Sequence, residues 1–201
     1  MASNAHTPPR GPRAARLAAL TIVMTGTLLL TPALLDPRGI GEARAPDPLT
    51  NPEAVVRVYG ADVWGLRGRF AIHTWVATKP RNALRYQIFE VIGWRARRGR
   101  PVLSIAEGDP ARDWFGSPAI LLHERRGPEA EALIGKVHDA VSRYPFSDEY
   151  TMWPGPNSNS FVAWIGLSVP ELGLQLPAKA VGQAWMKRNF SELLGSGKQG
   201  L

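Results

Sequence analysis

Short runs of β-branched and aromatic residues, separated by turn-forming residues, predict five strands before residue 125. The strands are expected at residues 55–59, 69–79, 86–94, 102–107 and 119–124. The run at residues 70–76 is largely apolar on both of its faces, which indicates that this strand is central in its sheet.

Apolar residues spaced by three and four positions predict helices after residue 127. The clearest helix begins at Pro128 and ends near Arg143, and its buried stripe consists of Ala130, Leu133, Ile134, Val137, Val141 and Tyr144. A second helix is expected to begin near Asn157, and a third, short helix to run from Pro177 to about Lys187. Strands followed by helices predict an α+β fold, in which two or three helices pack on an antiparallel sheet of about five strands.

Residues 17–35 carry no charge over 19 positions and follow Arg10, Arg13 and Arg16. Nineteen residues at helical rise approach the hydrocarbon thickness of a bilayer, and preceding basic residues orient that side toward the cytoplasm. We therefore expect one N-terminal transmembrane helix, with a cleaved signal segment as the alternative. Both interpretations place the residues after about 36 outside the cytoplasm.

This segment divides the chain into five parts. We expect a basic cytoplasmic leader at 1–16, an anchor at 17–35, a linker rich in Pro and Gly at 36–53, a globular domain at 54–190 and a flexible tail at 191–201.

Composition excludes several classes of chemistry. The chain has no cysteine, so it has no disulfide, no thiolate nucleophile and no cysteine-ligated metal. Its net charge is +7, but from residue 36 onward 21 Lys and Arg face 17 Asp and Glu. The one dense basic cluster, Arg95 to Arg100, is expected at an exposed turn, with anionic lipid headgroups or a cell-wall polymer as a possible partner. No nucleic-acid partner is expected.

The chain has four histidines, His6, His73, His123 and His138. None has metal-ligand spacing with another histidine, so no metal site is assigned and no cofactor is expected. His73 lies within the expected central strand and shares a face with Trp75. Because a buried histidine needs a hydrogen-bond partner, Glu90, a carboxylate inside the next apolar strand, is a candidate partner. A core histidine bonded to the backbone, to a tyrosine or to a glutamate is the structural alternative.

The sequence Trp153-Pro154-Gly155-Pro156-Asn157-Ser158-Asn159-Ser160-Phe161 predicts a rigid turn that leads into the second helix. A small polar residue at a helix start faces unpaired amide N–H groups, where enzymes place nucleophiles and most proteins place a cap. Ser158 is therefore a candidate nucleophile, with His73 as its base, Glu90 as the residue that orients His73, and helix-start amides as an oxyanion hole. The candidate binding residues around them are Asn157, Asn159, Ser160, Trp75 and Trp153.

Five blocks of sequence resemble, in order and spacing, a bacterial family described as domain of unknown function 3750. The blocks are His73-Thr74-Trp75, Phe89 to Trp94, Trp114-Phe115-Gly116, Trp153 to Phe161, and Leu176 to Gly182. The resemblance covers roughly residues 54–186 and implies a membrane-anchored envelope protein, with its N-terminus in the cytoplasm and its domain in the periplasm. It implies no established activity.

The motif at residues 157–161 is also similar to one in circularly permuted NlpC/P60 peptidases and lecithin:retinol acyltransferase-like proteins, which have a papain-like fold. That similarity implies that Ser158 stands where those enzymes have a nucleophilic cysteine, and that His73 takes the position of the base. Glu90 matches no motif of that family.

Two functions follow as expectations. The first is a non-catalytic, membrane-anchored module whose cleft at His73 and Ser158 binds a cell-wall peptide, a lipid or an envelope protein. The second is a serine-dependent hydrolase or acyltransferase that acts on an amide or ester in the cell envelope.

Overall fold

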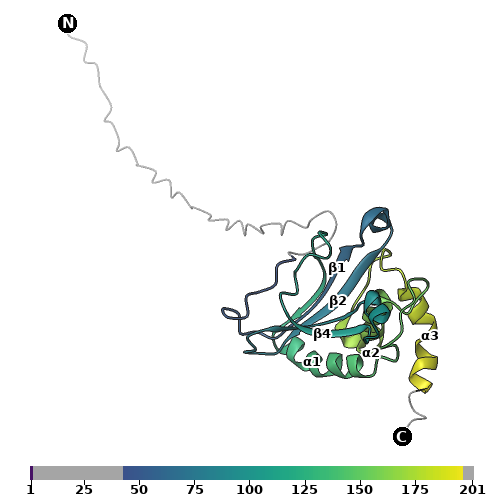
Figure 1. Ribbon diagram of the computed structural model, residues 1–201. Coiled ribbons are helices and arrows are strands. Elements are labelled where there is room, and N and C mark those ends of the chain that lie inside the picture. The colour runs from purple at the N-terminus through teal and green to yellow at the C-terminus, as the bar shows by residue number, and fades with distance from the viewer. Residues whose placement is uncertain (2–42, 197–201) are drawn as a thin grey trace. The chain divides into compact units, whose positions relative to one another are not determined.

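The computed structural model describes Met1 and residues 43–196. Residues 55–196 contain one five-stranded antiparallel sheet and the helices that cover it (Figure 1). The strands are β1 Val55–Asp62, β2 Ile72–Lys79, β3 Tyr86–Val91, β4 Leu103–Gly108 and β5 Ile120–Arg126. Their spatial order is β4-β3-β2-β1-β5, so β2 is the central strand, as predicted. The α+β class and the five antiparallel strands are confirmed.

Three α-helices follow the strands: α1 Gly127–Ser142, α2 Ser158–Ser168 and α3 Gln183–Ser196. Helices α1 and α2 lie side by side against one face of the sheet, and α3 packs against α2 (Figure 1). All six residues of the stripe predicted for α1 are buried in this core. The apolar stripe is therefore what fixes α1 on the sheet, where it covers Val56, Val58 and Val76.

The other face of the sheet is covered by two irregular segments. Ala43 and Ala45 pack there, as do Ala111 and Trp114 from the loop before β5. The buried guanidinium of Arg57 pairs with Glu124 and also donates to the backbone oxygen of Arg44 at 2.7 Å. Residues 43–46, which fall within the segment predicted as a linker over 36–53, therefore pack against the sheet.

Three 3₁₀ helices replace parts of the expected pattern. They are η1 Gly65–Arg69, η2 Gly93–Arg98 and η3 Pro170–Leu172. Strand β2 begins later than predicted because η1 extends to Arg69, and β3 ends earlier because the chain turns into η2 at Gly93. The third helix is displaced as well, since residues 177–182 form turns and α3 begins at Gln183. Residues 191–196, expected as tail, belong to α3.

The start of β2 pairs with β1 on one side but has no strand neighbour on the side of β3. The β2–β3 ladder ends at the pair Trp75–Glu90, so nothing in β3 bonds the backbone of Ile72. Its N–H donates instead to the backbone oxygen of Lys179 at 3.1 Å, and its C=O accepts from the side-chain amide of Asn159 at 3.0 Å. The first turn of α2 and the turn at 177–182 thus take the place of a strand.

The predicted transmembrane segment at 17–35 lies outside the described residues. Among the residues that are described, no helix has both the length and the apolar character required to cross a bilayer.

Replacing Asn159 with alanine should destabilise the fold strongly. Its side-chain N–H also donates to the backbone oxygen of Val181 at 2.8 Å, and its side-chain oxygen accepts from the buried hydroxyl of Thr74 at 2.9 Å. Leaving these groups unsatisfied should lower the free energy of unfolding by about 3 kcal/mol. Urea denaturation measures this, with Asn189→Ala, expected to cost less than about 1 kcal/mol, as the matched control. Equal losses in the two variants would contradict this role of Asn159.

Candidate functional site

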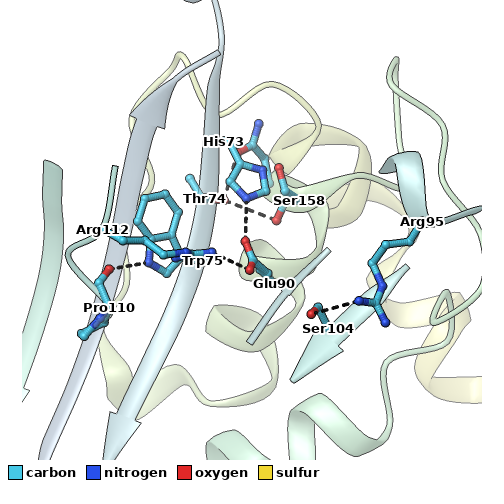
Figure 2. Close-up of polar contacts among 10 residues, drawn as sticks. His73, Thr74, Trp75, Glu90, Arg95, Ser104, Pro110, Arg112 and Ser158 are labelled. Carbon is cyan, nitrogen blue, oxygen red and sulfur yellow. Dashed lines mark hydrogen bonds and ion pairs between the residues drawn. The ribbon is translucent and has the colours of Figure 1, made fainter. Parts of the chain in front are cut away.

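The candidate site lies where β3 turns away from β2. His73 stands two residues before Trp75 on β2, and Trp75 pairs with Glu90 on β3. In an antiparallel ladder this makes His73 and Glu90 diagonal neighbours on the same face. The predicted contact is present: the Nε2 atom of His73 lies 3.1 Å from Oε2 of Glu90 (Figure 2).

Two further residues hold this pair. The Nη2 atom of Arg112 donates to Oε1 of Glu90 at 2.6 Å. The ring of Trp114 stacks on the imidazole of His73, with 3.6 Å between centroids and 9° between planes. Both residues come from the loop before β5, and Arg112 was not predicted because that loop has no periodicity to place it. Trp114 did appear in one of the sequence blocks shared with the family, but with no role assigned.

Protonation of the pair follows from its surroundings. Burial lowers the pKa of His73, and this outweighs the opposing effect of Glu90. Burial alone would raise the pKa of Glu90, but the hydrogen bond from His73 and the charge of Arg112 hold it below its usual value. A neutral imidazole therefore donates its Nε2 proton to an ionised carboxylate. Its Nδ1 atom is then an unprotonated acceptor, and it has no hydrogen-bond partner among the described residues.

Ser158 lies at the first position of α2 and is 5% exposed. Its backbone oxygen accepts from the hydroxyl of Thr74 at 3.3 Å, while its own hydroxyl forms no hydrogen bond within the described part of the chain. His73 and Ser158 line the same cavity and are drawn near each other in Figure 2. No hydrogen bond joins them in the described structure.

The helix cap engages two of the amides at the start of α2 that were predicted to offer an oxyanion hole. The side-chain oxygen of Asn157 accepts from the N–H groups of both Asn159 and Ser160 at 3.0 Å. These two amides are therefore used by the helix cap and are not free to bind a ligand oxygen. The side chain of Asn157 therefore competes with a ligand for these two donors.

The cavity at this site has a volume of about 840 Å³, which is within the range of small-molecule sites. Its interior walls are mainly apolar and include Ile72, Val91, Ile92, Trp114 and Val181. At the mouth, several large apolar side chains that line the cavity are exposed to solvent. These are Trp64 at 81%, Phe70 at 76%, Trp153 at 70%, Phe115 at 64% and Met152 at 60%.

The predicted binding residues separate into two groups. Trp153, Asn157 and Asn159 line the cavity, although both asparagines are fully engaged in holding α2 in place. Ser160 and Trp75 are buried outside it. Ser160 donates to the backbone oxygen of Gly182, and the indole N–H of Trp75 donates to the backbone oxygen of Pro110 at 2.8 Å.

Residues of η1 and η2 also line the cavity, and none of them was predicted as a site residue. They include Arg67 on η1 and Trp94, Ala96 and Arg97 on η2. Within the described residues, no group of three or more His, Cys, Asp or Glu side chains is arranged to hold a metal ion.

The free energy of unfolding should fall as the pH is lowered through the range in which His73 titrates in the unfolded chain. The folded state holds His73 neutral, whereas in the unfolded chain the same side chain binds a proton near the ordinary histidine pKa of about 6.5. Each such histidine can therefore contribute up to about 1.4 kcal/mol per pH unit of lost stability on acidification. Urea denaturation at about pH 7.5 and about pH 5.5 should show a smaller loss in His73→Gln than in the wild type. An unchanged pH dependence in the variant would contradict a neutral buried His73.

Comparison with known proteins gives one match. A family model described as "Protein of unknown function (DUF3750)" matches residues 53–185, which include both His73 and Ser158. No curated protein and no solved structure shows detectable similarity to the chain, so the likeness to NlpC/P60 proteins stays a hypothesis. The match spans most of the chain and agrees with the sequence blocks quoted above, and the chain therefore belongs to the DUF3750 family.

Proposed function

We propose that this protein is a membrane-anchored envelope protein whose cleft binds the apolar part of an amphipathic molecule. The observation that carries the proposal is the cavity of about 840 Å³, with apolar walls and a polar floor at His73 and Ser158. Burying an alkyl chain or ring against such walls is favourable roughly in proportion to the apolar area removed from water.

The polar groups at the floor suit a ligand with one acceptor or hydroxyl group. The Ser158 hydroxyl can donate or accept, and the unprotonated Nδ1 of His73 can accept. Because Glu90 is already paired with His73 and Arg112, its charge is compensated within the protein. A ligand group at the floor therefore need not carry a positive charge.

A serine-dependent hydrolase or acyltransferase is the second candidate, and one observation favours it. Glu90 fixes the His73 tautomer that leaves Nδ1 as a base, and Ser158 has no competing hydrogen bond among the described residues. In such a reaction the Ser158 oxygen would bond to a carbonyl carbon while its proton passes to Nδ1 of His73. That proton would then leave with the alcohol or amine. The binding function ranks first because the Asn157 cap occupies two of the helix-start amides that could otherwise stabilise the oxyanion.

A photoreactive fatty acid tests the binding proposal in the full chain. A diazirine-bearing fatty acid should crosslink within peptides that contain Ile92 and Phe115, as mapped by mass spectrometry. Ala96→Trp should reduce this labelling about ten-fold, equivalent to about 1.4 kcal/mol, because Ala96 is an exposed residue that lines the cavity and a large ring there would obstruct part of it. Ala106→Trp, at an exposed position on β4 outside the cavity, is the matched control. Labelling spread evenly over the surface, or unchanged by Ala96→Trp, would remove the proposal.

A serine-directed fluorophosphonate tests the second candidate. If Ser158 is a nucleophile, its oxygen should bond to phosphorus with loss of fluoride, and labelling should disappear in Ser158→Ala. His73→Gln should slow labelling, and Ser160→Ala is a control because Ser160 is buried outside the cavity. Equal labelling of wild type and Ser158→Ala would exclude Ser158 as the nucleophile.

A further inference from the structure

The mouth of the cavity combines exposed apolar side chains with exposed arginines. Five exposed apolar residues form its rim, which we call the aromatic rim: Trp64, Phe70, Phe115, Met152 and Trp153. They come from three separate segments, so the patch is created by folding and is not one apolar run in the sequence. Large exposed apolar patches of this kind mark interaction surfaces.

Basic side chains flank this rim on two sides. Helix η1 contributes the exposed Arg67 and Arg69, and the segment that begins with η2 contributes Arg97, Arg98 and Arg100. Arg67 and Arg97 line the cavity themselves. Arg95 differs from the others because it donates to the backbone oxygen of Pro101 at 2.6 Å. It also contacts the hydroxyl of Ser104 (Figure 2).

The charge at the mouth is not neutralised within the described structure. None of the five exposed arginines forms an ion pair with a described carboxylate. The carboxylates nearest along the chain to residues that line the cavity are Asp62, Glu90, Asp113 and Glu149. Asp62 is already paired with Lys179 at 2.6 Å, and Glu90 with Arg112 at 2.6 Å. The arginines are therefore available to an anionic partner.

Exposed tryptophan and phenylalanine side chains next to arginine side chains are typical of surfaces that bind anionic bilayers. Aromatic rings settle at the level of the headgroups, and arginines are attracted to negatively charged lipids. The apolar cavity opens between these side chains, so a surface docked in this way would place its entrance against the acyl chains. A charged polymer without an apolar phase would leave the aromatic rim in water.

We propose that the aromatic rim and its flanking arginines dock on the surface of an anionic lipid bilayer, so that the cavity receives its ligand from the membrane. This rests on the proposed binding function and deepens it by naming the source of the ligand. The docking is separate from any anchor, because it involves residues 64–70, 94–100, 115 and 152–153 of the globular domain.

The absence of cysteine from the chain permits a direct test, since one introduced thiol can be labelled without background. Met152→Cys in the full chain, labelled with the dye NBD, is incorporated into vesicles of phosphatidylglycerol and phosphatidylcholine or of phosphatidylcholine alone. Leu84→Cys is the control, because Leu84 is also exposed but lies in the turn at the opposite end of the β2–β3 hairpin.

With the anionic vesicles, the NBD emission at position 152 should shift to shorter wavelength, and the emission at position 84 should not. Arg97→Gln should lower the ratio of inserted to water-exposed label about five-fold, since one basic residue near such a surface contributes about 1 kcal/mol. Raising the salt concentration to about 1 M should reduce insertion further. Circular dichroism of each variant confirms that it is folded.

A label at position 152 that stays in water with the anionic vesicles would overturn the docking proposal, as would equal insertion with both vesicle types. These outcomes are distinguishable from failure of the proposed binding function. Fatty-acid crosslinking within the cavity, combined with a water-exposed label at position 152, would refute docking and retain binding.

Discussion

The site depends on the early end of the β2–β3 ladder. The pairing of β3 with β2 ends at Glu90, so the backbone groups of Ile72 on β2 need other hydrogen-bond partners. Asn159 and Lys179 supply them, which brings the start of α2 and the turn at 177–182 to the open end of the sheet. A buried backbone group left unpaired would cost free energy comparable to a lost hydrogen bond, so this substitution is obligatory. The cavity lies where β3 no longer pairs with β2.

The same requirement decides what chemistry the site can perform. Asn157 and Asn159 are engaged in holding α2 against β2, and this leaves Ser158 as the residue of the motif with an uncommitted side chain. On the other side of the opening, Arg112 and Trp114 fix the His73–Glu90 pair. The polar groups at His73 and Glu90 are therefore held by several contacts and the charge of Glu90 is compensated, while the rest of the lining is mainly apolar. Such a site discriminates by shape and by single hydrogen bonds more than by charge.

Local pattern predicted those features that follow from residue spacing. Alternation along β2 placed His73 and Trp75 on one face, and a carboxylate within an apolar strand identified Glu90 as its partner. The α1 stripe and the cap at Asn157 were likewise predictable from spacing and residue type. Arg112 could not be predicted, because it lies in an irregular loop whose position is set by packing on the sheet. Trp75 was predicted to be a binding residue because it shares a strand face with His73. Its side chain lies instead under the loop before β5, where it bonds Pro110.

The packing of residues 43–46 on the sheet limits the distance at which the domain can lie from a membrane segment at residues 17–35. Arg57 bonds the backbone of Ala43 and Arg44, and the hydroxyl of Tyr86 donates to the backbone oxygen of Pro46 at 3.0 Å. If residues 17–35 cross the membrane, only residues 36–42 separate the bilayer from this fixed point. Seven residues span at most about 25 Å even when fully extended. The first ordered residues of the domain would then stay within about 25 Å of the bilayer, and its encounters with the lipid surface would depend on rotation more than on diffusion.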